Sequence, residues 1–135
     1  MPVSRIAISE HRIEQWREAI STALQDALET SFSVPYGDCF QFFDSYHRHT
    51  RIFDRHYLCS AQTGRSDDFL LFHITAGKAR SLAQKQAFYA DLNARLVKAI
   101  GINPADVMIV VNFSDPEDWS FGNGKVFSLA DISSR

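Results

Sequence analysis

Residues 69–113 of this 135-residue chain read FLLFHITAGKARSLAQKQAFYADLNARLVKAIGINPADVMIVVNF. The apolar pattern predicts a strand at Phe69–Thr75, a helix from about Ser81 to Ile100 and a second strand at Val107–Phe113. The turn Gly101-Ile102-Asn103-Pro104 separates the helix from the second strand. The stretch is therefore a β-α-β unit, whose two strands are expected to run parallel with a right-handed crossover.

The first part of the chain repeats this order. Val3–Ile8 has the alternation of a strand, a helical period follows after Ser9, the predicted N-cap, and a second strand is predicted at Cys39–Phe43. The turn between them, Ser33-Val34-Pro35-Tyr36-Gly37-Asp38, aligns with the turn of the second unit. Two β-α-β units predict an α+β fold, a two-layer sandwich with a mixed four-stranded sheet and two helices on one face.

This repeat defines the expected organisation of the chain, which is long enough to bury a core without disulfides or a metal. Residues 51–58 alternate partially and allow one further short strand. Cys39 and Cys59 do not form a CxxC motif, so reduced thiols are predicted. We expect a single domain over residues 1–135, with repeat units at about 2–46 and 69–113, a connecting hairpin or loop at 44–68 and a C-terminal turn at 114–135.

Composition excludes several classes of function. The net charge is −2, with 22% charged and 45% hydrophobic residues, which is ordinary for a globular protein and gives no basic surface for nucleic acid. No apolar window is long enough for a membrane span, and the N-terminus lacks the apolar core of a secretory signal. We therefore expect a cytoplasmic protein with neither nucleic acid nor membrane as partner.

The connecting segment concentrates side chains that can bind metals or anions. Their spacing fits no closed metal motif, so no metal is predicted, and the arginines are interpreted as a solvated charged surface. No glycine-rich phosphate loop or dinucleotide fingerprint is present, and no cofactor is expected. These residues are His47, His49, His56, Asp44, Asp54 and Cys59 together with Arg48, Arg51, Arg55 and Arg65.

Pro2 is the first candidate for chemistry, because it directly follows Met1 and opens a strand. Initiator methionine is normally removed before a small residue, which leaves a secondary amine at the N-terminus. An α-amino group titrates at about 7.7–8.0, so it can act near neutral pH as a general base, a general acid or an imine-forming nucleophile. The alternative is that Pro2 only starts an edge strand, where its missing N–H costs nothing.

Four motifs spread over nearly the whole chain give this sequence a resemblance to a known family. Together they resemble the tautomerase superfamily and, within it, the malonate semialdehyde decarboxylase family, whose building block is a doubled β-α-β unit. The motifs are Pro2, the turn Val34-Pro35-Tyr36-Gly37-Asp38, the helix start Arg80-Ser81-Leu82-Ala83-Gln84-Lys85 and the turn Trp119-Ser120-Phe121-Gly122.

The resemblance implies a role for each matching residue. Pro2 would be the cation that polarises an aldehyde carbonyl or forms an iminium with it, and Asp38 would assist. Arg80 matches one of two arginines that hold the carboxylate lost as carbon dioxide, whereas Lys78 replaces the other. Lysine keeps the charge but lacks the planar fork of arginine, so a substrate other than malonate semialdehyde is plausible.

Trp119 and Phe121 would wall the pocket and lower its dielectric constant, although simple core packing is an equal alternative. The expected function is decarboxylation of a small oxo acid. An enol–keto tautomerase of the phenylpyruvate type and a hydratase remain alternatives on the same scaffold, and retention of Met1 would favour a non-catalytic oligomeric binding protein. The resemblance further implies a homotrimer with sites near the subunit boundaries, and the apolar strands need such a partner to cover the open face of the sheet.

Overall fold

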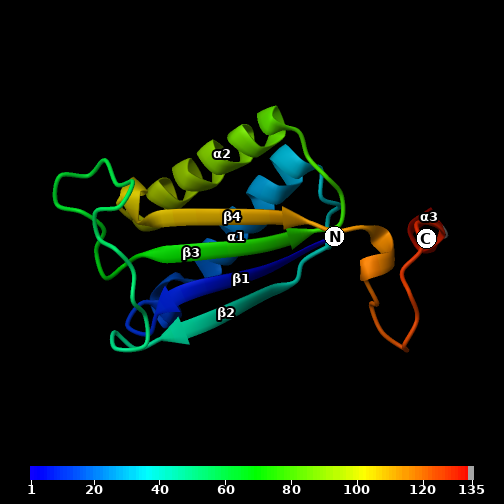
Figure 1. Cartoon of the computed structure of the whole chain (residues 1–135), viewed down its shortest axis with the longest axis horizontal. Coiled ribbons are helices and arrows are strands. Elements are labelled where there is room, and N and C mark those ends of the chain that lie inside the picture. Colours follow the sequence, from blue (N-terminus) through cyan, green and yellow to red (C-terminus); the bar gives the residue numbers. More distant parts are fainter. Residues whose placement is uncertain (134–135) are drawn as a thin grey trace.

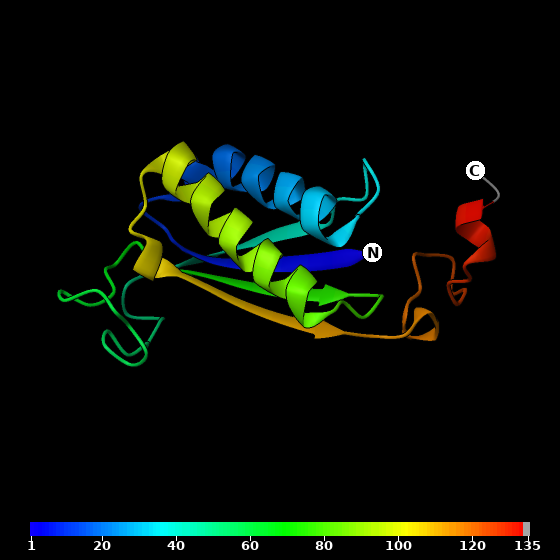
Figure 2. The same cartoon turned by 90° about the horizontal axis from the view of Figure 1, so that it is seen from above.

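The computed structural model describes residues 1–133 and has two layers, a four-stranded sheet and two long helices (Figure 1). Figure 2 shows both helices on the same face of the sheet. This confirms the predicted α+β architecture. The elements in chain order are β1 (Pro2–Ser9), α1 (Ile13–Phe32), β2 (Gln41–Tyr46), β3 (Leu70–Ala76), α2 (Leu82–Ile100), η1 (Pro104–Asp106), β4 (Val107–Phe113), η2 (Pro116–Asp118) and α3 (Ala130–Ser133). Of the predicted C-terminal turn, residues 134–135 lie outside the described residues.

The strand order is β2-β1-β3-β4. β1 pairs with β2 and β3 with β4 in parallel, as expected for β-α-β units, and the two units join through the antiparallel pair of β1 and β3. The register places Pro2 opposite Ala76, which in turn lies opposite Phe113. The start of β1 therefore lies at the same end of the sheet as the last residues of β3 and β4.

The core lies between the sheet and the helices. Alternate residues of β1 and β3 point inward, and each fully buried aliphatic or aromatic side chain contributes about 1.5–3 kcal/mol relative to exposure. Neither α1, α2 nor any other described helix has the length and apolar content needed to span a bilayer. The largest fully buried side chains are Phe32, Phe72, Phe88, Ile6, Ile8, Ile20, Leu24, Leu28, Leu70, Ile74, Leu92 and Leu96.

The two helix starts differ in how well the sequence predicted them. Ser81 caps α2 in a capping box, since its hydroxyl accepts from Gln84 N at 3.1 Å and Gln84 Oε1 accepts from Ser81 N at 2.9 Å. The prediction that Ser9 is the N-cap of α1 was wrong. Ser9 is the last residue of β1 and its hydroxyl forms a hydrogen bond with the His11 ring. Arg12 takes the cap position, and its side chain makes no capping hydrogen bond to the helix.

Two strand predictions also need correction. β2 runs over Gln41–Tyr46 instead of Cys39–Phe43, since its register with β1 begins at the pair of Ser4 and Gln41. Pro2 has no N–H with which to extend that ladder toward residue 39. The short strand allowed at 51–58 does not form, and residues 47–69 contain turns, bends and irregular backbone but no strand or helix.

Side-chain contacts, instead of the hydrogen bonds between paired strands, hold residues 47–69 in place. Arg51 donates to the carbonyls of Phe69 and Asp67 at 2.6 and 3.1 Å, and burial lowers the pKa of its guanidinium. Arg55 pairs with the Asp67 carboxylate at 2.7 Å. These arginines therefore hold the segment together, so the interpretation of a purely solvated charged surface was incomplete.

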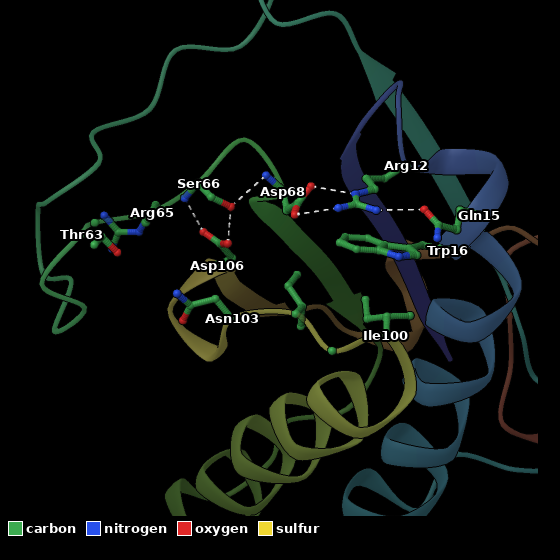
Figure 3. Close-up of a pocket in the computed structure, with 13 residues that line it drawn as sticks. Arg12, Gln15, Trp16, Thr63, Arg65, Ser66, Asp68, Ile100, Asn103 and Asp106 are labelled. Carbon is green, nitrogen blue, oxygen red and sulfur yellow. Dashed lines mark hydrogen bonds and ion pairs between the residues drawn. The ribbon is translucent and has the colours of Figure 1, made fainter.

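A second group of contacts joins the segment before α1 to the segment before β3, at the end of the sheet far from Pro2 (Figure 3). Arg12 Nε and Nη2 donate to the two oxygens of Asp68 at 2.9 and 3.2 Å, and the Arg12 guanidinium lies 4.4 Å from the centre of the Trp16 ring. His11 Nε2 lies 3.1 Å from Asp68 Oδ1. The hydrogen bonds from Arg12 lower the pKa of Asp68 below its ordinary value of 3.8, and His11 adds to the effect.

We expect Asp68→Asn to lower the free energy of unfolding at pH 7 by about 1 kcal/mol, because it removes a charge-assisted bidentate pair. A carboxyl with a depressed folded-state pKa stabilises the protein above its ordinary pKa, and that contribution is lost as the pH falls through the folded-state value. Urea denaturation at pH 7 and at pH 3 measures both effects. The difference between the two proteins should be smaller at pH 3 than at pH 7, and the control Glu117→Gln should change stability at neither pH.

Candidate active site

The segments that carry the predicted site residues meet at the end of the sheet where β1 begins (Figure 1). Pro2 is the first residue of β1 and is buried there. The turn that carries Lys78 and Arg80 directly follows the end of β3, and the turn that carries Trp119 follows β4. The antiparallel pairing of β1 with β3 therefore brings together segments that are far apart in the sequence.

Met1 shows what surrounds the nitrogen of Pro2. Its ammonium lies 2.9 Å from Asp38 Oδ2, and both side chains are largely shielded from solvent. Its carbonyl oxygen accepts a hydrogen bond from Gly77 N at 3.2 Å, and its side chain packs on Gly77 close to Trp119. Met1 thus fills the space in front of Pro2, between the carboxylate of Asp38 and the backbone of Gly77.

A tight turn aims Asp38 at the N-terminus. Asp38 N donates to Pro35 O at 3.1 Å, and Gly37 has a φ of +86°, which favours glycine. The helix end just before this turn is fixed by Ser33 in the left-handed region. Asp38 is therefore a turn residue and also an ion-pair partner of the terminal amine.

Arg80 links the two β-α-β units. Its Nε and Nη2 donate to Phe32 O at 3.3 and 2.8 Å, Nη1 donates to Lys78 O, and the guanidinium lies 5.1 Å from the centre of the Phe32 ring. Burial lowers the pKa of Arg80. Phe32 O lies at the negative C-terminal end of α1, which favours a cation. Two of the five N–H groups of Arg80 keep no protein partner among the described residues.

Two further cations lie near Arg80. Lys78 is exposed, and its ammonium pairs with no carboxylate of the described chain. Lys85 lies one turn into α2, and its Nζ is 5.8 Å from the centre of the Phe113 ring. Phe113 lies opposite Ala76 in the sheet, and Ala76 lies opposite Pro2. Sequence reasoning gave Lys85 no role. The i to i+4 spacing from Ser81 was the signal that could have placed it on this side of the helix.

The aromatic pair of the C-terminal turn stands outside the core. Trp119 Nε1 donates to Ser114 Oγ at 2.7 Å, and the Trp119 and Phe121 rings stack with centres 5.6 Å apart. Phe121 also meets the Phe40 ring at 6.0 Å. Neither Trp119 nor Phe121 belongs to the core between sheet and helices, so the alternative of simple core packing does not describe them.

The site can hold an anion beside a basic nitrogen. Lys78, Arg80 and Lys85 place positive charge beside the N-terminus, and the half-buried aromatic wall reduces solvent screening. Among residues 1–133 no group of three or more histidine, cysteine or acidic side chains is placed to hold a metal ion. Hydrogen-bond and proton chemistry is what this set of residues supports.

Comparison with known proteins places this geometry in a family. The family model described as tautomerase enzyme matches residues 38–122, more than half of the chain. The chain belongs to the tautomerase family. The Probable tautomerase YusQ of Bacillus subtilis is 31% identical over 125 residues, which cover 93% of this tautomerase-family chain and 96% of the relative.

Solved structures extend the comparison to decarboxylases. A malonate semialdehyde decarboxylase, solved in wild-type, mutant and inactivated forms, is 26% identical to this tautomerase-family chain with a TM-score of 0.82, covering 91% of this chain and 92% of the other. A second malonate semialdehyde decarboxylase, inhibited by 3-bromopropiolate, is 29% identical with a TM-score of 0.81 and 91% coverage of both chains. A fused 4-OT symmetric trimer, 20% identical with a TM-score of 0.73, covers 98% of this chain and 99% of its own and shares the fold.

The contacts of Arg80 predict a structural role that Lys78 lacks. Arg80→Ala should lower the free energy of unfolding by about 1–2 kcal/mol, because it leaves the buried carbonyl of Phe32 without its donors. Lys78→Ala is the matched control and should leave stability unchanged within about 0.5 kcal/mol, as expected for an exposed, unpaired lysine. Urea denaturation of both variants decides the point, and equal stabilities would contradict it.

Proposed function

We propose that this tautomerase-family enzyme decarboxylates a small 3-oxo acid of the malonate semialdehyde type, using the amine that Pro2 exposes once Met1 is removed. The observation that carries the proposal is the position of the Asp38 carboxylate, 2.9 Å from the present N-terminal ammonium and directly in front of Pro2. Likeness over nine-tenths of the chain to two malonate semialdehyde decarboxylases supports it.

Removal of Met1 converts the Pro2 nitrogen from an amide into a secondary amine. The nearby carboxylate of Asp38 favours the protonated form of that amine. A protonated Pro2 then donates a hydrogen bond to the carbonyl oxygen of the substrate and stabilises the negative charge that develops on it.

The cations at the start of α2 are proposed to bind the substrate carboxylate. The substrate carboxylate would bind the two free N–H groups of Arg80 and the ammonium groups of Lys78 and Lys85. These groups lie at the N-terminal end of α2, where the helix dipole is also positive. When the bond between the carboxylate carbon and the adjacent carbon breaks, its electron pair forms the enolate, carbon dioxide leaves, and the Pro2 ammonium supplies the proton that the carbon takes up. Trp119 and Phe121 are proposed to keep water from the site.

Enol–keto tautomerisation is the second candidate function. The name of the Bacillus subtilis relative, Probable tautomerase YusQ, favours it, as does Lys78, which stands where the decarboxylase family has arginine. In that reaction a neutral Pro2 would act as a base and move a proton between oxygen and carbon. If Met1 stays attached, the amide nitrogen has no basicity and the chain would serve only as a binding protein.

Pro2→Ala should lower kcat/KM for malonate semialdehyde by about 10²- to 10⁴-fold, the usual contribution of a positioned proton donor. Alanine also permits removal of Met1, so intact mass spectrometry must first verify the N-terminus of both proteins. Pro104→Ala, at the far end of the sheet, is the control and should keep full activity. Undiminished turnover by the processed Pro2→Ala protein would refute the role of Pro2, and activity on phenylenolpyruvate alone would favour the tautomerase candidate.

We further propose that the chain assembles as a homotrimer whose subunits cover the open face of the sheet. Phe42, Met108 and Val110 lie on that face and are 40–51% exposed. The face is less apolar than the strand sequences suggested, because Arg5 and Asp44 form an ion pair on it at 2.7 Å. The segment after β4 also turns away from the two-layer body (Figure 2). It carries further exposed apolar side chains.

Sedimentation equilibrium should give three times the chain mass of 15.3 kDa. Val110→Asp should lower that mass or prevent folding, because it buries an unpaired carboxylate in the contact. Val97→Asp places the same charge on α2, away from the open face, and should remain trimeric. A folded, active monomer of the unmodified protein would exclude the trimer.

A further inference from the structure

Gly77 is buried directly after β3, where the backbone of the second unit meets the N-terminus. Its N–H donates to the carbonyl oxygen of Met1 at 3.2 Å. The carbonyl carbon of Met1 is bonded to the nitrogen of Pro2. The acceptor of the Gly77 N–H is therefore an oxygen only two bonds away from that nitrogen.

Removal of Met1 takes this acceptor away. A buried N–H without a partner costs free energy, so the Gly77 N–H must bond to whatever next occupies the space in front of Pro2. A substrate carbonyl that accepts a hydrogen bond from the Pro2 ammonium places its oxygen close to the position of the Met1 oxygen. The Gly77 N–H already points at that position and needs no rearrangement.

The absence of a side chain at Gly77 fits the same interpretation. Gly77 is not among the glycines with positive φ, so its backbone does not require glycine. An added β-carbon would meet the flexible end of the Met1 side chain and would lie 3.3 Å from Trp119 Nε1, which is a tight contact. Once Met1 is removed, such a β-carbon would project into the volume left between Gly77, Trp119 and Asp38.

We propose that the Gly77 N–H is a second hydrogen-bond donor to the carbonyl oxygen of the oxo acid, opposite the Pro2 ammonium. The inference rests on the proposed function of Pro2. Charge develops on that oxygen as the carbon–carbon bond breaks, and a fixed backbone dipole in a shielded site stabilises it without reorganisation. The site then recognises acids that carry an oxygen at this carbon and binds saturated acids of equal length more weakly.

An amide-to-ester replacement tests the donor without changing a side chain. Glycolic acid in place of Gly77, in protein with a verified Pro2 N-terminus, should lower kcat by about tenfold to a hundredfold and change KM little. The fall is smaller than the about 10²–10³ typical of removing one oxyanion-hole donor, because the Pro2 ammonium, a full cation, stabilises the same oxygen. Glycolic acid at Gly101 is the control, since the Gly101 N–H donates to Val97 O at 2.9 Å at the far end of α2. Equal kcat values for the two esters would overturn the proposal.

Nuclear magnetic resonance separates this inference from the proposed reaction. Acetoacetate, a 3-oxo acid, should shift the Gly77 amide proton downfield, whereas butyrate, which lacks the carbonyl, should not. If the unmodified protein turns over no 3-oxo acid, the proposed function fails, and the Gly77 resonance still decides whether this N–H binds a carbonyl oxygen. An identical response to both acids would overturn the inference even in an active enzyme. Gly77→Ala should abolish the acetoacetate shift, because its β-carbon occupies the same space.

Discussion

The antiparallel pairing of β1 with β3 is the constraint on which the rest of the molecule depends. Each β-α-β unit makes its own parallel strand pair, and only this central ladder joins the two pairs into one sheet. A slip of one residue would turn Ile6 and Ile8 from the core to the open face. The same slip would move Pro2 away from Ala76 and Gly77. Core burial and the assembly of the site are therefore set by one register.

The two ends of the sheet use charge differently. At the far end nearly every arginine is matched by a carboxylate or a backbone carbonyl, as in the pair of Arg12 and Asp68, and the charges hold loops in place. At the Pro2 end Lys78, Arg80 and Lys85 gather at the positive end of α2, and the Asp38 carboxylate pairs with the terminal ammonium. A cluster of cations costs stability in the absence of an anion. It is the electrostatic pattern expected of a site for a carboxylate.

Arg80 shows how one side chain can serve both the fold and the site. Three of its N–H groups satisfy backbone carbonyls that end α1 and precede α2, which fixes the guanidinium in position. The remaining two are then held in a fixed direction with little conformational entropy left to lose on binding. Lys78 has the same charge without that support, so its ammonium is held less precisely than the guanidinium of Arg80.

Periodicity acts between near neighbours, and for that reason the sequence by itself determined the two β-α-β units and the start of the second helix near Ser81. Pro2 became a candidate through its position after Met1, and Asp38 through the resemblance to the tautomerase superfamily. Predictions from neighbouring residues failed where a competing or distant group determined the structure. The Ser9 hydroxyl forms a hydrogen bond with His11 and does not cap α1, and the start of β2 depends on the missing N–H of Pro2. Only the tertiary structure showed the hydrogen bonds from Arg80 to the Phe32 carbonyl, the position of the Lys85 ammonium beside the Phe113 ring and the hydrogen bond from Gly77 N to Met1 O. Each of these depends on strand register and helix packing, which bring together atoms that no sequence spacing relates.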